Sequence, residues 1–310
     1  MIATKKKQST GPQRKKPQVL ERRTLGYIML VPATLAIFAI AIYPFAYGIL
    51  LSFQEYNLRR PAQRGFIGID NFVRILTTDR EFYGTLQYSF FYTIMVVLFS
   101  YITGLGLALL LNREVKFRGF FRAMILMPWV ISPAVAATSW IWVLNDRVGI
   151  INVTLRNLGI IDTPIQFLAN TDIVRWTVIF TSAWRAYPFM MIVILAGLQG
   201  IPKDLYESAY IDGAGFFKSF AYITMPMLKT VSAISTTLMF IWTFNNFEGI
   251  YLLTRGGPNH ATFVLPILTY YMAFYRANLG YASAIAVIML VILLLISTLY
   301  LKFVNKKGID

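Results

Sequence analysis

The sequence contains no cysteine and a single histidine, His260, and only 14% of its 310 residues are charged. Without cysteine there can be no disulfide and no cysteine metal site, and one histidine gives little basis for a zinc centre. We therefore expect no metal and no cofactor in this chain. Soluble domains carry about 25% charged residues. The low charge, with a 57% share of hydrophobic residues, predicts a protein that crosses a membrane several times.

The sequence also lacks a phosphate loop of the form GxxxxGK[ST]. The nearest candidate ends at Lys218 and Ser219, which would require glycine at Asp212 and Phe217. A bulky side chain at the second of these positions would block the backbone cradle that holds a phosphate. No nucleophile and base pair is evident around His260 either. We therefore expect no enzyme site, so the energy for any transport must come from a partner or an ion gradient.

Apolar runs about as long as a bilayer-spanning helix recur along the chain, each roughly 20 residues or more. They predict an all-α fold with six transmembrane helices. We place these at 25–52, 86–111, 123–144, 173–198, 227–252 and 281–303. The other expected segments are a basic tail (1–24), an outer segment (53–85), a loop at 202–226 and a C-terminal tail (302–310).

Positive charge is distributed unevenly between the two sides that these spans define. Most Lys and Arg residues, and every lysine, lie on the side of the N-terminal tail, in the link 112–122, in the stretch 200–230 that contains the loop 202–226, and near the C-terminus. Cytoplasmic loops carry an excess of Lys and Arg. The distribution predicts both termini in the cytoplasm, and it accounts for the net charge of +15 without a nucleic-acid partner.

The loop 202–226 is the longest mixed polar stretch between two apolar runs. Pro202 suits the first turn of a helix, and the residues at 203–211 are all compatible with one. Gly213 and Gly215 then allow a sharp backbone turn before a second amphipathic piece. On pattern alone, the first helix could rest on lipid headgroups or dock into a groove on a soluble partner.

The spacing of this loop resembles the EAA motif of the membrane subunits of binding-protein-dependent ABC importers. In that motif, E-A-A-x-x-D-G-A is followed after nine positions by I-x-x-P. The matching residues are Glu207, Ser208, Ala209, Asp212, Gly213, Ile223 and Pro226. Ser208 departs from the usual alanine, and serine is small enough to preserve close packing. The resemblance implies that these residues couple the chain to an ATPase.

Three further stretches resemble the sugar-importing branch of this family, in the subunits related to the larger maltose-importer and the glycerol-3-phosphate-importer membrane subunits. They are WRAYPFMMIVILAGLQ (184–199), LLTRGGP (252–258) and YYMAFYRANLGYA (270–282). The resemblance implies a type I importer transmembrane fold with its core at 86–301, in a bacterial inner membrane. It also implies a second permease subunit, two cytoplasmic ATPases that use ATP and magnesium, and an extracytoplasmic sugar-binding protein.

Polar residues inside the predicted spans are candidates for a substrate path because they are costly in lipid. They stand among aromatic residues, and such a mixture suits a sugar, whose ring face is apolar and whose edge carries hydroxyls. The candidates are Tyr92, Trp184, Arg185, Trp242, Asn245, Asn246, Glu248 and Tyr251. The same residues could instead make hydrogen bonds between helices or form an aromatic belt at the membrane interface.

Three other functions fit parts of the pattern. A glycerol-3-phosphate importer would need cationic groups in the path. Arg185 is the only basic residue placed well inside a predicted span, since Arg175, Lys229 and Lys302 lie within three residues of a span end. An ion-coupled secondary carrier would be expected to show inverted repeats and acids near the middle of the membrane; neither is evident. A structural scaffold would require neither the glycine corner nor the polar fifth span.

Overall fold

A computed structural model describes residues 19–113 and 116–306, so parts of the predicted tails, 1–18 and 307–310, lie outside the described residues. The chain divides into two compact units, Met1–Leu50 and Leu51–Asp310. In the first unit, α1 (Val19–Ile37) leads through a π-helical turn (Phe38–Ile42) into α2 (Tyr43–Ser52). Large apolar side chains such as Ile40 and Tyr43 are exposed on this unit, as expected where a helix faces lipid.

The second unit carries the remaining helices and one short sheet, in which β1 (Gln54–Glu55) pairs antiparallel with β2 (Gly65–Phe66), Gln54 opposite Phe66. The helices are α3 (Asp70–Thr77), α4 (Arg80–Asn112), α5 (Arg118–Val130), α6 (Pro133–Val143), α7 (Ile150–Asn157), α8 (Thr171–Gln199), α9 (Lys203–Ile211), α10 (Phe216–Ser219), α11 (Met225–Phe244), α12 (Glu248–Thr254), α13 (Leu265–Tyr270) and α14 (Leu279–Lys306). A 3-10 turn (Pro61–Gln63) and two π-helical turns (Phe220–Thr224, Tyr271–Tyr275) complete the described elements.

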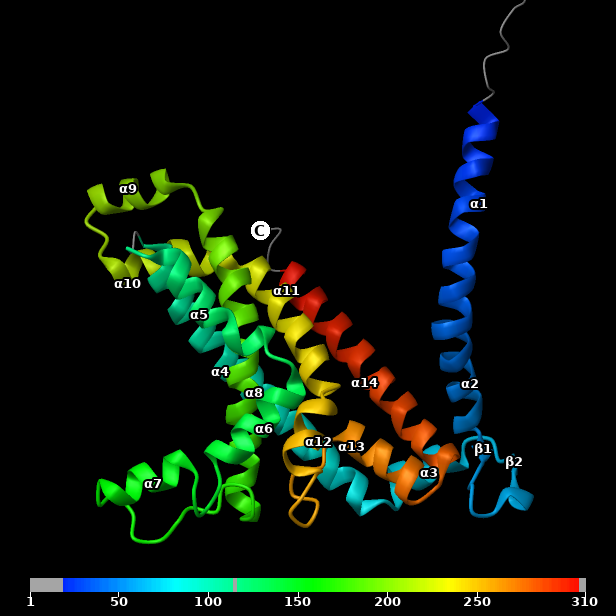
Figure 1. Ribbon diagram of the computed structural model, residues 1–310. Coiled ribbons are helices and arrows are strands. Elements are labelled where there is room, and N and C mark those ends of the chain that lie inside the picture. The colour runs from blue at the N-terminus through cyan, green and yellow to red at the C-terminus, as the bar shows by residue number, and fades with distance from the viewer. Residues whose placement is uncertain (1–18, 114–115, 307–310) are drawn as a thin grey trace, which may run out of the picture. The chain divides into compact units, whose positions relative to one another are not determined.

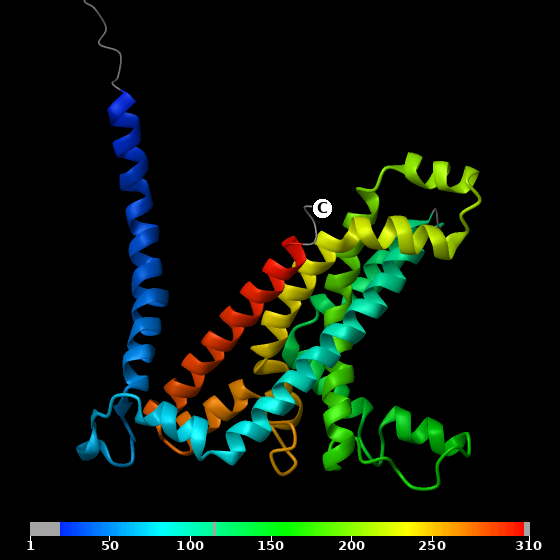
Figure 2. The same cartoon turned by 180° about the vertical axis from the view of Figure 1, so that it is seen from behind.

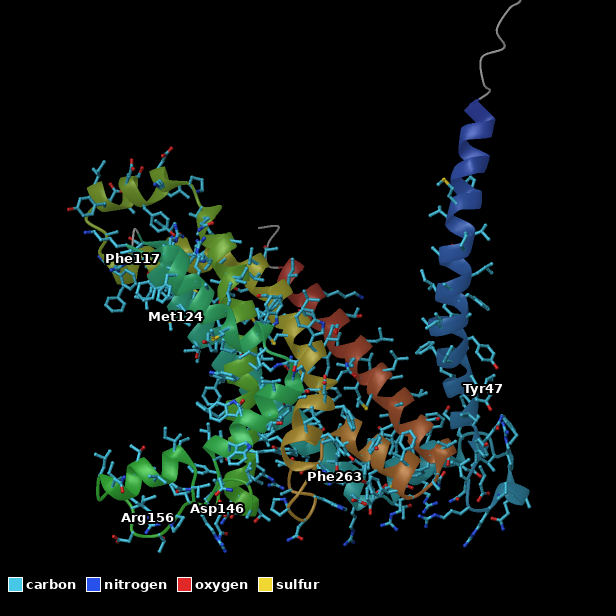
Figure 3. All side chains as sticks on the ribbon, viewed as in Figure 1. Tyr47, Phe117, Met124, Asp146, Arg156 and Phe263 are labelled. Carbon is cyan, nitrogen blue, oxygen red and sulfur yellow. The ribbon has the colours of Figure 1, made fainter. Side chains whose placement is uncertain are left out.

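The two ends of this second unit differ in what they carry. Figures 1 and 2 show α9 and α10 at one end, and α7, α13 and the loop after α12 at the opposite end. Figure 3 places Phe117 at the α9 end and Asp146, Arg156 and Phe263 at the α7 end. The stretch 202–226 therefore lies at one end of the bundle, as the sequence predicted for a loop between two spans.

The described residues include five helices long and apolar enough to cross a membrane, or six if a bent pair counts as one span. The bent pair corrects the expected single helix at 123–144, because α5 and α6 meet at an angle of 94°. Ser132 is extended (ψ 147°), as a residue before proline tends to be, and its Oγ accepts a hydrogen bond from the Val135 amide. Pro133 then occupies the first turn of α6, so the local sequence ends one helix and begins another.

The fifth span also differs from the expected helix at 227–252. The observed span runs from Phe216 to Phe244, and α12 begins separately at Glu248. At the break, the Asn245 side-chain amide donates to the Ile241 carbonyl, 2.9 Å away. Asparagine competes for backbone hydrogen bonds in this way, which makes it a weak residue for a helix interior.

The long helices α4 and α8 make the most extensive helix pair of the unit. At their crossing, a Cβ added to Gly104 would lie 2.7 Å from Met190 Cβ and 2.9 Å from the Met191 amide nitrogen. Only glycine allows so close an approach, and small residues have this role at helix interfaces in membranes. Glycine at this position therefore sets the spacing of α4 and α8.

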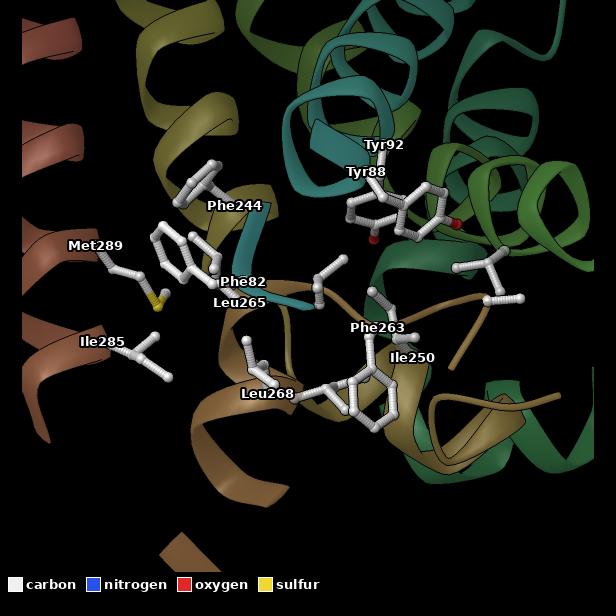
Figure 4. Packing of buried hydrophobic residues seen from close by; sticks show 14 of the residues in the cluster. Phe82, Tyr88, Tyr92, Phe244, Ile250, Phe263, Leu265, Leu268, Ile285 and Met289 are labelled. Atoms are coloured by element: carbon white, nitrogen blue, oxygen red, sulfur yellow. The ribbon is translucent and has the colours of Figure 1, made fainter. Parts of the chain in front are cut away.

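Two clusters of buried side chains form the core. One gathers α4, α8, α11, α13 and α14 toward the α13 end, where Phe82, Phe244 and Leu265 are almost fully buried (Figure 4). The other lies toward the α9 end and includes Ala108, Met190 and Leu228. Between and beside these clusters the interrupted helices α5–α6 and α11–α12 leave room for a cavity.

Candidate functional site

A cavity of about 190 Å³ lies within the helical bundle, lined by residues from α4, α5, α6, α8, α11 and α12 and from the break before α12. Its polar lining consists of Tyr92, Thr181, Ser182, Arg185, Thr243 and Asn246. Its aromatic lining consists of Tyr92, Trp129, Trp140, Phe189 and Trp242. The cavity combines flat apolar faces with hydroxyl, amide and guanidinium groups, which is the usual composition of a small-molecule site.

A chain of hydrogen bonds joins three helical segments at one wall of this cavity. The hydroxyl of the fully buried Tyr92 donates to Ser182 Oγ (2.9 Å) and accepts from Asn246 Nδ2 (2.8 Å). Asn246 Oδ1 accepts from the Gly249 amide (3.1 Å), at the start of α12. Figure 4 shows Tyr92 beside Tyr88 at this level of α4. The network therefore fixes the interrupted span against the two continuous helices.

Among the residues that the structure describes, Arg185 is the only charged one that lines the cavity. Its Nε is buried and has no hydrogen-bond partner within the described part of the chain. Cations in membrane spans are costly and usually face a cavity or a partner. Arg185 can therefore donate to an anionic or hydroxyl-rich ligand that enters this space.

Aromatic side chains also line the cavity, and one of them, Phe189, lies one turn from Arg185 on α8. The rings of Phe189 and Trp242 meet nearly edge to face, with centroids 4.9 Å apart, and Trp129 lies 6.1 Å from Phe189. Trp242 is half exposed (51%), so part of its ring remains free. Rings held in this way can cover the apolar face of a sugar without losing much conformational entropy on binding.

The structure brings four of the predicted path residues to the cavity and leaves four outside it. Tyr92, Arg185, Trp242 and Asn246 line it; Trp184, Asn245, Glu248 and Tyr251 do not. Trp184 instead packs against Trp140, with ring centroids 5.3 Å apart. Asn245 and Glu248 are exposed at the break between α11 and α12, and Tyr251 lines a second cavity near the α13 end.

Sequence reasoning missed the lining residues contributed by small hydroxyl groups and by the bent pair α5–α6. Ser182, Arg185 and Phe189 are spaced three and four residues apart in α8, which places them on one helical face. That spacing was a usable signal for Ser182. Trp129 and Trp140 flank the break at Ser132, and their convergence depends on the 94° bend, which the apolar pattern does not reveal.

The α9 end carries the EAA-like residues on a corner closed by backbone hydrogen bonds. Gly213 is left-handed (φ +78°), the Gly213 amide donates to the Tyr210 carbonyl (3.0 Å), and the Ala214 amide donates to the Ala209 carbonyl (2.8 Å). This is the Schellman arrangement, in which a glycine after the helix end satisfies the last free carbonyls. Gly213 is thus required for its backbone conformation, since a Cβ there would meet nothing within 4 Å.

The side chains of this corner divide into an outer face and an inner face. Glu207, Ser208 and Asp212 are exposed, whereas Ala209 and Ile223 are half-buried. Pro226 is exposed in the first turn of α11. The Glu207 side chain is exposed on the outer face, and no backbone amide of the described residues caps its carboxylate.

The inner face is tied to the bundle. The Tyr206 and Thr224 hydroxyls lie 2.9 Å apart, which joins α9 to the π-helical turn before α11. Tyr206 and Ile223 also pack against the core cluster at this end. A force applied to the exposed face of α9 would therefore reach α11 as well as α8.

Basic residues surround this end. Arg113 lies over the Phe216 ring, 5.8 Å from its centroid. With the Gln199 amide turned so that its oxygen faces them, Arg118 and Arg122 both donate to that oxygen, at 2.8 and 3.0 Å. No group of three His, Cys, Asp or Glu residues that could hold a metal occurs among the residues described.

Comparison with known proteins agrees with this architecture. The trehalose/maltose transport system permease protein MalF of Thermococcus litoralis is 34% identical over 90% of this chain and 92% of its own length. A solved chain of a bacterial ABC transporter involved in importing the acidic polysaccharide alginate aligns with a TM-score of 0.81 at 24% identity, covering 93% of this chain and 97% of that one. A second structure, with an alginate pentasaccharide-bound periplasmic protein in the complex, gives 0.78 at 25% identity and covers 91% and 94% of the two chains.

The family comparison covers the corner and the helices that form the cavity, except for the first part of α4, which carries Tyr92. Residues 100–307 match the family described as binding-protein-dependent transport system inner membrane component. The matched range includes α8, α9 and α11, and so contains the whole EAA-like stretch. The resemblance drawn from the sequence is confirmed: the chain is an integral membrane permease and belongs to the binding-protein-dependent transport system inner membrane components.

Proposed function

We propose that this chain is one permease subunit of an ATP-driven importer that carries a carbohydrate, most simply an oligosaccharide, across the membrane. The observation that carries the proposal is the cavity in which Tyr92, Asn246 and Arg185 face aromatic rings inside the bundle. The relative named for trehalose and maltose, and the structural neighbour that imports alginate, support a saccharide substrate. Membership of a binding-protein-dependent family sets aside the ion-coupled carrier.

The partners follow from the family and from the neighbour whose structure contains a periplasmic protein. An extracytoplasmic sugar-binding protein delivers the substrate, and a second permease completes the membrane pathway as a heterodimer. Two cytoplasmic ATPases supply ATP hydrolysis with magnesium, and one of them docks on the α9 corner. The chain itself needs no cofactor.

The α9 end is assigned to the cytoplasm of a bacterial inner membrane, with both termini on that side. Lys203 and Lys218 lie at this end, and Arg147 and Arg156 at the other. Because lysine is confined to one side of the spans, the positive-inside rule supports this orientation. Glu207, Ser208 and Asp212 are then accessible to a soluble ATPase.

Transport proceeds by alternating access. The α9 corner joins α8 to α11, and both of these helices line the cavity. When the ATPases close on ATP, movement of α9 shifts α8 and α11 and changes the side from which the cavity is reached. Binding of substrate in the cavity biases the same equilibrium, since a ligand shifts a conformational equilibrium by its difference in affinity for the two states.

The corner provides the first test. We expect Gly213→Val to assemble normally yet lose substrate-dependent ATP hydrolysis and uptake, because a β-branched residue disfavours the left-handed backbone by about 1–2 kcal/mol. Gly215→Val is the matched control: Gly215 is extended (φ −75°, ψ 176°) and a Cβ there would also meet nothing within 4 Å. Normal uptake by Gly213→Val at normal expression contradicts the coupling assignment.

Assembly and substrate are tested together. The tagged chain, purified in mild detergent from its native membrane, should retain a P-loop ATPase and a second permease. If the chain instead purifies without partners and transports without ATP, the proposal is wrong.

The substrate is tested by comparing the uptake of labelled maltose, an alginate oligosaccharide and glycerol-3-phosphate. The buried Nε of Arg185, which has no partner among the described residues, favours anionic substrates, so glycerol-3-phosphate remains the second candidate. Arg185→Gln should reduce uptake of an anionic probe more than that of maltose.

A further inference from the structure

A second cavity, of about 300 Å³, lies where α12 ends and α13 begins. Its polar and aromatic lining includes Tyr251, Arg255, Asn259, His260, Tyr270 and Tyr275. It shares no lining residue with the cavity inside the bundle. A space of this size matches the lower end of the range found for ligand sites.

Three of its lining residues hold an uncommon backbone conformation. Arg255 (φ 52°), Asn259 (φ 46°) and His260 (φ 60°) are left-handed although none of them is glycine. Such conformations are energetically costly for residues other than glycine, and they cluster at ligand-binding positions. The strained backbone therefore marks this loop as a candidate site independently of the cavity.

The loop is held in place by its histidine. His260 Nδ1 lies 2.8 Å from Glu81 Oε1 at the start of α4, and the imidazole stacks on the Phe263 ring with centroids 3.9 Å apart. Gly256 packs directly beneath the Phe263 ring, where a Cβ would not fit. These contacts fix the loop between Arg255 and Phe263 against the bundle, so the cavity wall is preorganised.

Tyrosine rings form the other wall. Tyr251 and Tyr270 meet edge to face with centroids 5.2 Å apart, and Tyr271 stacks with Tyr275 at 5.4 Å. Tyr275 is 53% exposed, so its ring offers a free surface. Tyr251 and Tyr275 bring their hydroxyls within 3.4 Å of each other. The wall thus presents flat apolar faces with hydroxyls at their edges.

Arg255 brings a cation to this wall. The hydrogen bond with Tyr251 raises the pKa of Tyr275, and the nearby positive charge of Arg255 acts in the opposite direction. Arg255 makes no hydrogen bond through its side chain to any residue in the described ranges, and no carboxylate lines the cavity. Its guanidinium donors are therefore available to a ligand.

We propose that this second cavity binds one sugar unit, whose ring stacks on a tyrosine while its hydroxyl or carboxylate oxygens accept hydrogen bonds from Arg255 and Asn259. Aromatic faces with adjacent hydrogen-bond donors suit a saccharide better than an apolar ligand. The inference rests on the proposed import function, since the cavity lies at the end of the bundle opposite α9, where a delivered saccharide would arrive. It adds a binding step before the sugar reaches the cavity around Asn246.

The absence of cysteine makes the test specific. Asn259→Cys is introduced into the assembled transporter in membrane vesicles and labelled with a membrane-impermeant maleimide. Maltotriose or an alginate trisaccharide at about 10 mM should slow labelling about tenfold for a Kd near 1 mM. Asp162→Cys, on an exposed loop outside the cavity, should label at an unchanged rate.

Protection of Asn259→Cys by either sugar supports the site, and the two sugars decide between neutral and acidic units. No protection by either, or no labelling of Asn259→Cys in the assembled complex, overturns it. Should Asn259→Cys fail to assemble, Arg255→Ala decides: the KM for uptake should rise with kcat retained, whereas Arg147→Ala should match the parent. If the site fails while the Gly213→Val and Gly215→Val pair behaves as expected, only this inference falls and the import function stands.

Discussion

The helices of the second unit fall into two kinds that meet at the cavity. α4 and α8 are continuous over Arg80–Asn112 and Thr171–Gln199 and pack closely through Gly104. The pair α5–α6 is bent by 94°, and the fifth span stops at Phe244 before α12 begins. Continuous helices thus form one wall of the cavity, and interrupted helices form the other.

The difference shows where a membrane protein can place polar groups. A continuous helix satisfies its own backbone, so it can face lipid or pack tightly. A break frees backbone groups, which is tolerated at membrane depth only where protein or a water-filled cavity surrounds them. Here the break after Phe244 exposes Asn246 to the cavity, and the Tyr92 hydroxyl on continuous α4 bonds to it. The continuous helix α4 thus holds the polar side chain at the break in the fifth span.

The largest expected effect comes from separating the continuous helices. Gly104→Leu should lower the free energy of unfolding by about 3 kcal/mol, because overpacking forces α4 away from Met190. Thermal unfolding of the detergent-purified transporter, followed by size-exclusion recovery, measures the change. Gly106→Leu is the control, since Gly106 lies in the same helix and a Cβ there would meet nothing within 4 Å. Equal stability of the two variants would show that the α4–α8 contact does not set the spacing.

A smaller effect is expected where the two kinds of helix are joined. Asn246→Ala leaves the Gly249 amide without its acceptor and the Tyr92 hydroxyl without its donor. Loss of buried partners costs about 2 kcal/mol, and uptake should fall with it. Asn245→Ala removes one exposed bond to the Ile241 carbonyl and should change uptake little. Equal uptake by the two alanine variants would show that the hydrogen bonds of Asn246 to Tyr92 and Gly249 do not contribute to transport.

The smallest effect is expected at the bend itself. Ser132→Ala removes the side-chain acceptor of the Val135 amide at the start of α6. The loss should be about 0.5–1 kcal/mol, since this cap is long at 3.4 Å and exposed. Ser139→Ala, at an exposed position within α6, should have no measurable effect on thermal stability. If Ser132→Ala lost more stability than Asn246→Ala, the bend between α5 and α6 would depend on the Ser132 cap more than on Pro133.

The features that sequence reasoning reached are those set by local chemistry. Gly213 was expected to shape a corner after the helix at 203–211, and the structure shows it left-handed at that helix end. The apolar runs likewise located the long spans to within a few residues for α8 and α14. Helix ends and glycine turns depend on neighbouring residues, so a single sequence carries the necessary signal.

What remained out of reach depends on contacts between distant segments. The apolar run at 123–144 predicts one span although it contains Pro133, because hydropathy carries no information on the angle between the two helices that form there. Trp184 and Arg185 are adjacent in sequence, yet only Arg185 lines the cavity. Which of two neighbours faces inward is decided by the rotation of α8 against α4, α6 and α11, and no local pattern fixes that rotation.

The shared acceptor on Gln199 has a mechanical consequence. With the Gln199 amide turned toward them, Arg118 and Arg122 in the first turns of α5 both donate to this last residue of α8, which continues through Ile201 and Pro202 into α9. A movement of the α9 corner would thus reach two helices, α8 through the chain itself and α5 through the contact with Gln199. The far end of α5 carries Trp129 at the cavity. Trp129 on α5 and Arg185 on α8 are therefore both connected through Gln199 to the α9 corner.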